Sequence, residues 1–190
     1  MSSVSGQSNA TCFKTPSQFS ITPVRSEEDL KDALILLYEY TKWLDLDLTF
    51  QNFDAEMANM PGKYAPPNGE LFLARSPEGN AVGCVAVRPL TDAVCEMKRL
   101  WVRDSAKGIG LGKALVFAVV DAGGRLGYSK MRLDTLPRMT AAVKMYRSLG
   151  FLDIKPYYET PLVGTHFLEL DLTKPWGTSD HESQGTTSEE

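Results

Sequence analysis

The sequence is poor in the residues from which several common sites are built. It contains two histidines and three cysteines in 190 residues. So few imidazole and thiolate ligands argue against a zinc site, and we expect no bound metal. Neither Cys84 nor Cys95 has a histidine near it in the sequence, so we expect no cysteine nucleophile. Both cysteines lie in apolar strand patterns, which predicts buried, reduced thiols.

Charge and hydropathy argue against further classes. The formal net charge is −4 at pH 7, so the chain lacks the basic character typical of nucleic-acid binding. No apolar run is long enough to span a membrane, and residues 1–18 lack the hydrophobic segment of a signal peptide. We therefore expect a cytoplasmic protein with neither nucleic acid nor a membrane as partner. The oligomeric state stays open, and a homodimer is compatible with the sequence.

Composition divides the chain into one domain and two polar ends. Ser, Thr, Gln and Asn are frequent in residues 1–18, and Gly, Ser, Thr and acidic residues are frequent in 175–190. Such segments cannot bury enough apolar surface to fold, so both are predicted to be a disordered arm and tail. Residues 19–174 are long enough to form a single domain with its own core.

Hydrophobic periodicity predicts a mixture of strands and helices in that domain. Strands are expected at residues 19–24, 70–75, 81–88, 94–102, 130–135, 151–155 and 166–172. Helices are expected at residues 27–44, within 46–60, from 111 to between 123 and 127, and at 139–149. A strand hairpin precedes a strand–helix–strand unit, so the fold class is α/β (α+β) with a mixed sheet.

One stretch organises the rest of the chain: VCEMKRLWVRDSAKGIGLGKALVFAVVDA, residues 94–122. Its glycine-rich turn is KGIGLGK, residues 107–113, and a helix follows. Glycines on alternate positions leave room for a ligand, and the helix start offers free N–H groups and a positive dipole end. This combination binds phosphate, although a glycine-rich connection without a ligand is the alternative. The glycine spacing of this turn differs by one residue from that of the P-loop and by one residue from that of the dinucleotide fingerprint, so neither motif is present.

The pattern that fits is [QRK]-x-x-G-x-G, formed by Lys107, Gly110 and Gly112. It resembles the coenzyme A pyrophosphate loop of the Gcn5-related N-acetyltransferases, and the element order over residues 19–172 is similar to theirs. The resemblance implies an acyl-CoA N-acyltransferase fold, with a mostly antiparallel sheet of about seven strands and a splayed βαβ cofactor site. It also implies acetyl-CoA as cosubstrate. The residues implied to bind it are Leu100, Trp101, Val102, Lys107, Gly108, Ile109, Gly110, Leu111, Gly112 and Lys113.

Glu96 is the candidate base. Its position relative to the loop resembles that of a glutamate in the histone-modifying members of the family. A carboxylate within an apolar strand is costly unless it is paired. The alternative is therefore a structural ion pair with Lys98, Arg99 or Arg132.

Tyr146 is the candidate acid. It occupies the tyrosine of a pattern that the family shows, N-x-x-A-x-x-L-Y-x-x-x-G-F, which implies that its phenol protonates the departing coenzyme A thiolate. The alternative is a core tyrosine on an amphipathic helix. Met139 replaces the asparagine of this pattern, which removes one expected cofactor contact. Segments 95–102 and 132–136 also resemble a subgroup of uncharacterised microbial acetyltransferases with C-E-M-K-R-L-Y-V and R-L-D-T-L strands.

The acceptor is expected between the first two helices and the loop before the last strand. Its candidate walls are Trp43, Asp45, Asp47, Phe50, Phe53, Tyr64, Tyr157 and Tyr158. Aromatic rings together with acids suit a small cationic amine, although solvated aspartates at a helix junction are the alternative. We predict an N-acetyltransferase that moves an acetyl group directly from acetyl-CoA to a small-molecule amine. Alternatives are a non-catalytic acyl-CoA-binding module, a nucleotide-binding switch domain and an enzyme that acetylates a protein amine.

Overall fold

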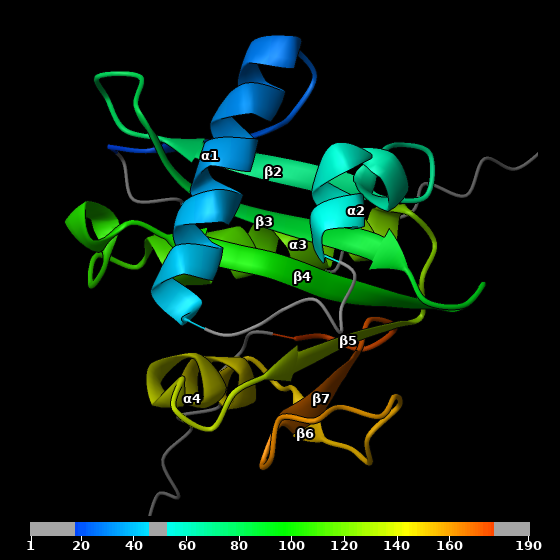
Figure 1. The fold of residues 1–190 in the computed structure, drawn as a ribbon. Helices are drawn as coiled ribbons and strands as arrows, with labels where there is room; N and C mark the ends of the chain where they lie inside the picture. The colour runs from blue at the N-terminus through cyan, green and yellow to red at the C-terminus, as the bar shows by residue number, and fades with distance from the viewer. Residues whose placement is uncertain (1–17, 46–52, 177–190) are drawn as a thin grey trace, which may run out of the picture.

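The computed structural model describes residues 18–45 and 53–176, which form a twisted sheet with helices on both faces (Figure 1). The strands are β1 (Ser20–Pro23), β2 (Glu70–Arg75), β3 (Ala81–Pro89), β4 (Val94–Val102), β5 (Lys130–Thr135), β6 (Leu152–Asp153) and β7 (His166–Asp171). The helices are α1 (Glu27–Leu44), α2 (Phe53–Ala58), α3 (Leu111–Arg125) and α4 (Thr140–Ser148), with short 3₁₀ turns at Gly62–Tyr64 and Asp104–Ala106.

The described strands form one seven-stranded sheet in the order β1-β2-β3-β4-β5-β7-β6. Every neighbouring pair is antiparallel except β4 and β5, which are parallel and are joined through α3. The predicted mixed, mostly antiparallel sheet is therefore confirmed. A parallel pair needs a long crossover, and the apolar stripe of α3 covers the sheet where it makes that crossover.

Two hydrophobic cores lie on opposite faces of this sheet. On one face α1 and α2 cover β2, β3 and β4, with Leu36, Leu37 and Leu71 almost fully buried. On the other face α3 and α4 pack against the sheet around Leu115 and Met131. β3 is buried along most of its length because helices cover both of its faces.

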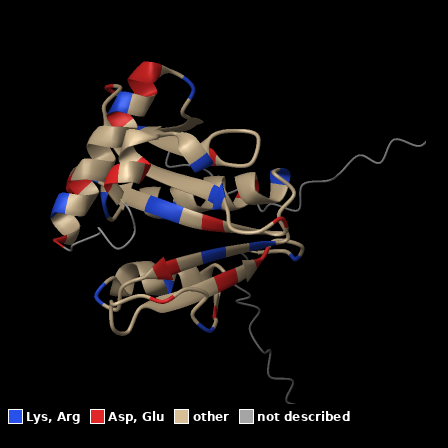
Figure 2. Ribbon diagram, turned by 45° about the vertical axis from the view of Figure 1, so that its right-hand side comes forward, with Lys and Arg blue, Asp and Glu red and all other residues tan. Residues whose placement is uncertain are grey.

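The sheet opens between β4 and β5. Only three residue pairs join them, from Val94 opposite Lys130 to Glu96 opposite Arg132. Beyond Glu96 the two strands diverge, while β5 continues to pair with β7 as far as Thr135. Figure 2 shows charged segments along both strands where they separate. The predicted splay is therefore present.

A bulge in β4 accompanies the divergence. Arg99 has φ 62°, a left-handed conformation that is uncommon for a residue other than glycine. The register between β3 and β4 shifts at this point, because Cys84 lies opposite Trp101 and Ala86 lies opposite Lys98. An extra residue in one strand re-aims side chains and is frequent next to active sites.

Local signals in the sequence set the ends of two helices. The backbone N–H of Asp29 donates to Ser26 Oγ at 3.1 Å, so Ser26 caps the start of α1. At the end of α4, Gly150 has φ 95° and its N–H donates to the Arg147 carbonyl. Phe151 N–H donates to the Tyr146 carbonyl, which completes a Schellman motif at Gly150.

Two predicted elements are shorter in the structure. The strand expected at 151–155 is only Leu152–Asp153, because the N–H of Phe151 is used in the cap of α4. Of the helix expected within 46–60, α2 occupies Phe53–Ala58, and residues 46–52 lie outside the described part. The predicted arm, apart from Gln18, and the predicted tail beyond Trp176 also lie outside it. Trp176 itself packs against Phe117, with ring centroids 5.0 Å apart.

None of the helices within residues 18–45 and 53–176 combines the length and the apolar composition needed to cross a bilayer.

Candidate active site

The glycine-rich turn leads directly into α3. Gly110, with φ 87°, immediately precedes the helix, and no side chain caps the first backbone N–H groups. These N–H groups have no helical partner, so they and the positive end of the helix dipole can bind an anion. A Cβ built on Gly112 would meet only Val102 Cγ2, at 3.9 Å. The space beside Gly112 is therefore open to a ligand.

Lys107, the first residue of the motif, lies beside two indole rings. Its Nζ is 4.8 Å from the ring centroid of Trp101 and 5.1 Å from that of Trp43. It also pairs with Asp104 at 2.6 Å. Trp43, expected as an acceptor wall, therefore lies at the glycine-rich turn. Trp101 is buried in the core under α1, so its side chain faces away from Tyr146.

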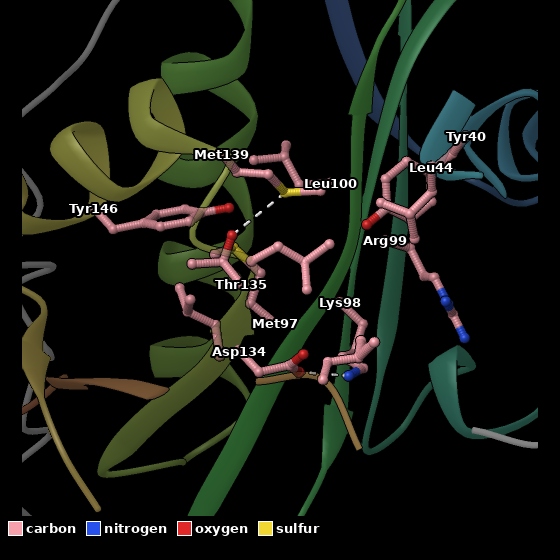
Figure 3. A pocket seen from close by; sticks show the side chains of 13 residues that line it. Tyr40, Leu44, Met97, Lys98, Arg99, Leu100, Asp134, Thr135, Met139 and Tyr146 are labelled. Carbon is pink, nitrogen blue, oxygen red and sulfur yellow. Dashed lines mark hydrogen bonds and ion pairs between the residues drawn. The ribbon is translucent and has the colours of Figure 1, made fainter. Parts of the chain in front are cut away.

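A cavity of about 80 Å³ occupies the space between the diverging strands. Leu100 borders it from β4, Asp134 and Thr135 border it from β5, and Met139 and Tyr146 come from the start and the body of α4 (Figure 3). Sequence reasoning expected Tyr146 beside the end of β4, and the structure brings Tyr146 and Leu100 into this one cavity.

Tyr146 is buried, and this burial raises the pKa of its hydroxyl above the ordinary value. The hydroxyl forms no hydrogen bond with the residues that the structure describes, and Figure 3 shows it directed toward β4. Met139 lies nearby, with its Sδ 3.4 Å from Thr135 Oγ1. A neutral phenol aimed into a narrow cavity is a suitable proton donor.

Glu96 lies at the last pair between β4 and β5 and is almost fully buried. Nη2 of Arg88, on β3, lies 2.8 Å from Glu96 Oε2. The Tyr157 hydroxyl donates to Glu96 Oε1 at 2.8 Å. Lys98 Nζ is 3.6 Å from Oε1. Of the partners expected from the sequence, only Lys98 is within range.

The other two expected partners of Glu96 pair elsewhere. Arg99 Nε donates to Glu56 Oε1 at 2.8 Å, and Arg132 Nε donates to Glu169 Oε2 at 2.8 Å. An ion pair between Glu96 and Arg99 or Arg132 was therefore the wrong alternative. Sequence reasoning missed Arg88, which precedes Glu96 by eight residues on the neighbouring strand. A basic residue at the end of the apolar strand β3 was the available signal.

A second cleft, of about 250 Å³, lies next to these charged residues. It is lined by Glu56, Arg88, Leu90, Glu96, Lys98, Arg99, Tyr157, Tyr158 and Glu159. Two of the expected acceptor walls, Tyr157 and Tyr158, are in this lining. Tyr64 donates to Glu56 beside it, and the Phe53 ring lies 5.0 Å from Arg99 Cζ.

The other expected walls are not part of this cleft. Asp45 ends α1, and Asp47 and Phe50 lie outside the described residues. The cleft and the cavity between the strands share two lining residues, Lys98 and Arg99. The two spaces therefore adjoin at the bulge of β4, on either side of the strand that holds Glu96.

The open sheet and the glycine-rich turn before α3 define an acyl-CoA N-acyltransferase fold, and comparison with known proteins agrees. The sequence matches the model of the Acetyltransferase (GNAT) family over residues 37–151, more than half of the chain. An uncharacterized N-acetyltransferase of Schizosaccharomyces pombe is 44% identical over 160 residues, which cover 84% of this chain and 98% of that protein. The chain therefore belongs to the GNAT acetyltransferase family and is an acetyltransferase.

Solved structures show the same fold. A GNAT family acetyltransferase from Staphylococcus aureus has a TM-score of 0.68 at 18% identity, covering 81% of this chain and 99% of that one. A GNAT family acetyltransferase from Elizabethkingia anophelis, solved with acetyl-CoA bound, has a TM-score of 0.55 at 19% identity, covering 82% and 99%. The predicted family and fold are confirmed.

Proposed function

We propose that this protein transfers an acetyl group from acetyl-CoA directly to the amine of a small molecule. The observation that carries the proposal is the pair of adjoining spaces, which meet at Lys98 and Arg99. The space with Tyr146 suits the thioester, and the cleft beside Glu96 suits the amine. Acetyl-CoA supplies an activated acyl group, and the chain must supply the binding, the orientation and the proton transfers.

The residues divide between binding and proton transfer. The free N–H groups at the start of α3 and the turn of residues 107–113 bind the pyrophosphate. The main chain of β4 that faces the gap, at Leu100 to Val102, holds the pantetheine arm and polarises the thioester carbonyl. As the new C–N bond forms and the C–S bond breaks, Tyr146 gives its proton to the thiolate.

The two cysteines in the described part of the chain favour direct transfer. Cys84 and Cys95 are free and buried, as expected from the sequence. Burial raises the pKa of each thiol to about 12, so neither is a thiolate at neutral pH. Neither lines the cavity or the cleft. A covalent acetyl-cysteine at either residue is therefore not part of the proposal.

The amine proton must travel to Glu96 through another group. The Glu96 side chain borders the cleft but is only 2% exposed, so an amine in the cleft reaches little of its carboxylate directly. The Tyr157 hydroxyl lines the cleft and donates to Glu96 Oε1. Tyr157 accepts the amine proton while its own proton passes to Glu96, so the hydroxyl is neutral before and after. Burial, and then the charge of Glu96, raise the pKa of Tyr157, which keeps this hydroxyl protonated.

Glu96→Gln and Tyr157→Phe should each lower kcat by about a hundredfold or more, with little change in acetyl-CoA affinity. Because the two groups act in one relay, the double variant should be no slower than the slower single variant. Release of free thiol from acetyl-CoA measures the rate. Tyr128→Phe is the matched control, since it removes a hydroxyl bound to the Asn68 carbonyl.

Two results would contradict the relay. If Glu96→Gln lowers the melting temperature but leaves turnover unchanged, Glu96 serves only as an ion-pair partner of Arg88. If the losses of the two single variants simply add, Tyr157 and Glu96 act independently.

The function itself is tested with a panel of small amines and acetyl-CoA, by following free thiol and the mass of the product. Acetylated product from at least one amine supports the proposal. Tight binding of acetyl-CoA without turnover on any amine would support the binding module instead.

A further inference from the structure

The charged groups around the cleft balance one another almost completely. Three ion pairs involve the cations of its lining: Arg99 with Glu56 at 2.8 Å, Arg88 with Glu96 at 2.8 Å, and Lys98 with Asp134 of the adjoining cavity at 2.7 Å. Each cation is thus compensated by one carboxylate. An acceptor that brings a large net charge into this cleft would upset the balance, because charges in a partly buried site are weakly screened.

One strong donor in this network has no partner. Arg99 Nη2 is buried and forms no hydrogen bond with any residue in the described ranges. The Arg99 side chain is only 4% exposed, and its Nε donates to Glu56 Oε1 at 2.8 Å. A buried guanidinium donor without an acceptor is costly, and such groups in native structures call for an explanation.

The cleft also contains a carboxylate that has no cationic partner among the described residues. Glu159 lies in the lining, is exposed, and forms no ion pair with the residues that the structure describes. Glu159 and the Tyr157–Glu96 relay offer anionic surroundings to an ammonium group. Arg99 is also in this lining, and its Nη2 carries two N–H groups without an acceptor among the described residues.

We propose that the acceptor is a zwitterion, an amino acid whose ammonium faces Tyr157 and Glu159 and whose carboxylate accepts from Arg99 Nη2. This inference rests on the proposed acetylation of a small amine and adds the class of amine. A carboxylate is the group that the planar guanidinium fork recognises best. Because Nη2 has almost no accessible surface, the proposal requires the cleft wall to move before a carboxylate reaches it. A simple cationic amine would leave Nη2 without a partner.

The first experiment compares acids with their own amides in the wild-type protein. Glycine, β-alanine, 4-aminobutanoate and 6-aminohexanoate are each assayed beside the corresponding amide, with acetyl-CoA saturating. The acid should exceed its amide in kcat/KM by about 10- to 100-fold for at least one chain length, the gain expected from a charged hydrogen bond. The length that gives the largest ratio reports the span between the relay and Arg99.

The second experiment removes the donor. Arg99→Lys keeps the charge beside Glu56 but lacks the second nitrogen of the fork, and Arg99→Gln removes the charge as well. Both should bring the acid-to-amide ratio close to one, mainly by lowering kcat/KM for the acid. Arg75→Gln is the control, because Arg75 pairs with Asp29 and Asp32 away from the cleft, and its ratio should match wild type. Melting temperatures identify any variant that fails to fold, and the wild-type ratio stands without the variants.

The outcomes separate the two proposals. Acetylation of acids and amides at equal efficiency at every length would overturn the zwitterion inference and leave the acetylation of small amines standing. A strong preference for acids that survives in both Arg99 variants would overturn the assignment to Arg99. Turnover of no amine at all would overturn the proposed function, and the inference that rests on it.

Discussion

Gly112→Asp is expected to abolish acetyl-CoA binding without unfolding the protein. The added Cβ has room on the protein side, where its nearest neighbour would be Val102 Cγ2 at 3.9 Å. The carboxylate, however, would stand in front of the free N–H groups at the start of α3, where the pyrophosphate is proposed to bind. Steric exclusion and like-charge repulsion in a partly buried site should together cost about 3–5 kcal/mol. The dissociation constant should therefore rise at least about a hundredfold.

Calorimetric titration with acetyl-CoA measures this change, and the melting temperature reports the fold. Gly124→Asp is a matched control, because it adds the same charge to an exposed position on α3 where a Cβ would meet no neighbour within 4 Å. Gly110 is a less suitable target, since its φ of 87° would strain any other residue. If folded Gly112→Asp bound acetyl-CoA as tightly as wild type, the pyrophosphate site would have to lie elsewhere.

Tyr146→Phe should lower kcat by about two to four orders of magnitude while KM stays nearly constant. The ring remains, so its tilted contact with Phe151, at a centroid distance of 5.7 Å, is kept. Only the hydroxyl is lost, and it forms no bond to a described residue, so the free energy of unfolding should change little. The proton it gives to the thiolate matters mainly in the transition state, which is why the effect falls on kcat. Steady-state assays of thiol release measure it.

The pH dependence of kcat provides a second test of Tyr146 as the general acid. Burial raises this pKa above its ordinary value of 10.0, so the hydroxyl remains protonated throughout the neutral and mildly alkaline range. A general acid is lost only as the pH rises through its pKa, so kcat should show no decline due to Tyr146 below pH 10. The effect of Tyr146→Phe should also shrink with a thioester whose thiol is more acidic. A variant as fast as wild type would remove Tyr146 from the chemistry and leave the family assignment intact.

The fold was largely predictable because its strands and helices carry strong local patterns. The apolar residues of β2, β4 and β5 predicted the observed bounds of these strands. The prediction was wrong for residues 151–155, because Phe151 contributes its N–H to a helix cap and leaves a two-residue strand. Periodicity indicates which face of an element a residue is buried on, but it does not indicate which acceptor the backbone N–H group binds.

The chemistry of the cleft was less predictable, since its contacts join residues far apart in the chain. Tyr157 donates to Glu96 across 61 residues of sequence, and Arg99 pairs with Glu56 across 43. The bulge at Arg99 turns this side chain away from the partner expected from strand alternation. Trp43 was expected near the acceptor because it is aromatic and lies at the end of α1. The packing of α1 across the sheet places it beside Lys107 instead.

We expect the junction between β4 and β5 also to affect how long the protein survives in a cell. Beyond Glu96 no strand pairing holds the two halves of the sheet together, so this end opens at a lower free energy than the core unfolds. A donor bound across the gap opposes that opening, by an amount that grows with the logarithm of its concentration. Resistance to proteolysis would then follow the supply of acetyl-CoA, so a shortage of the donor would deplete the enzyme as well as slow the reaction.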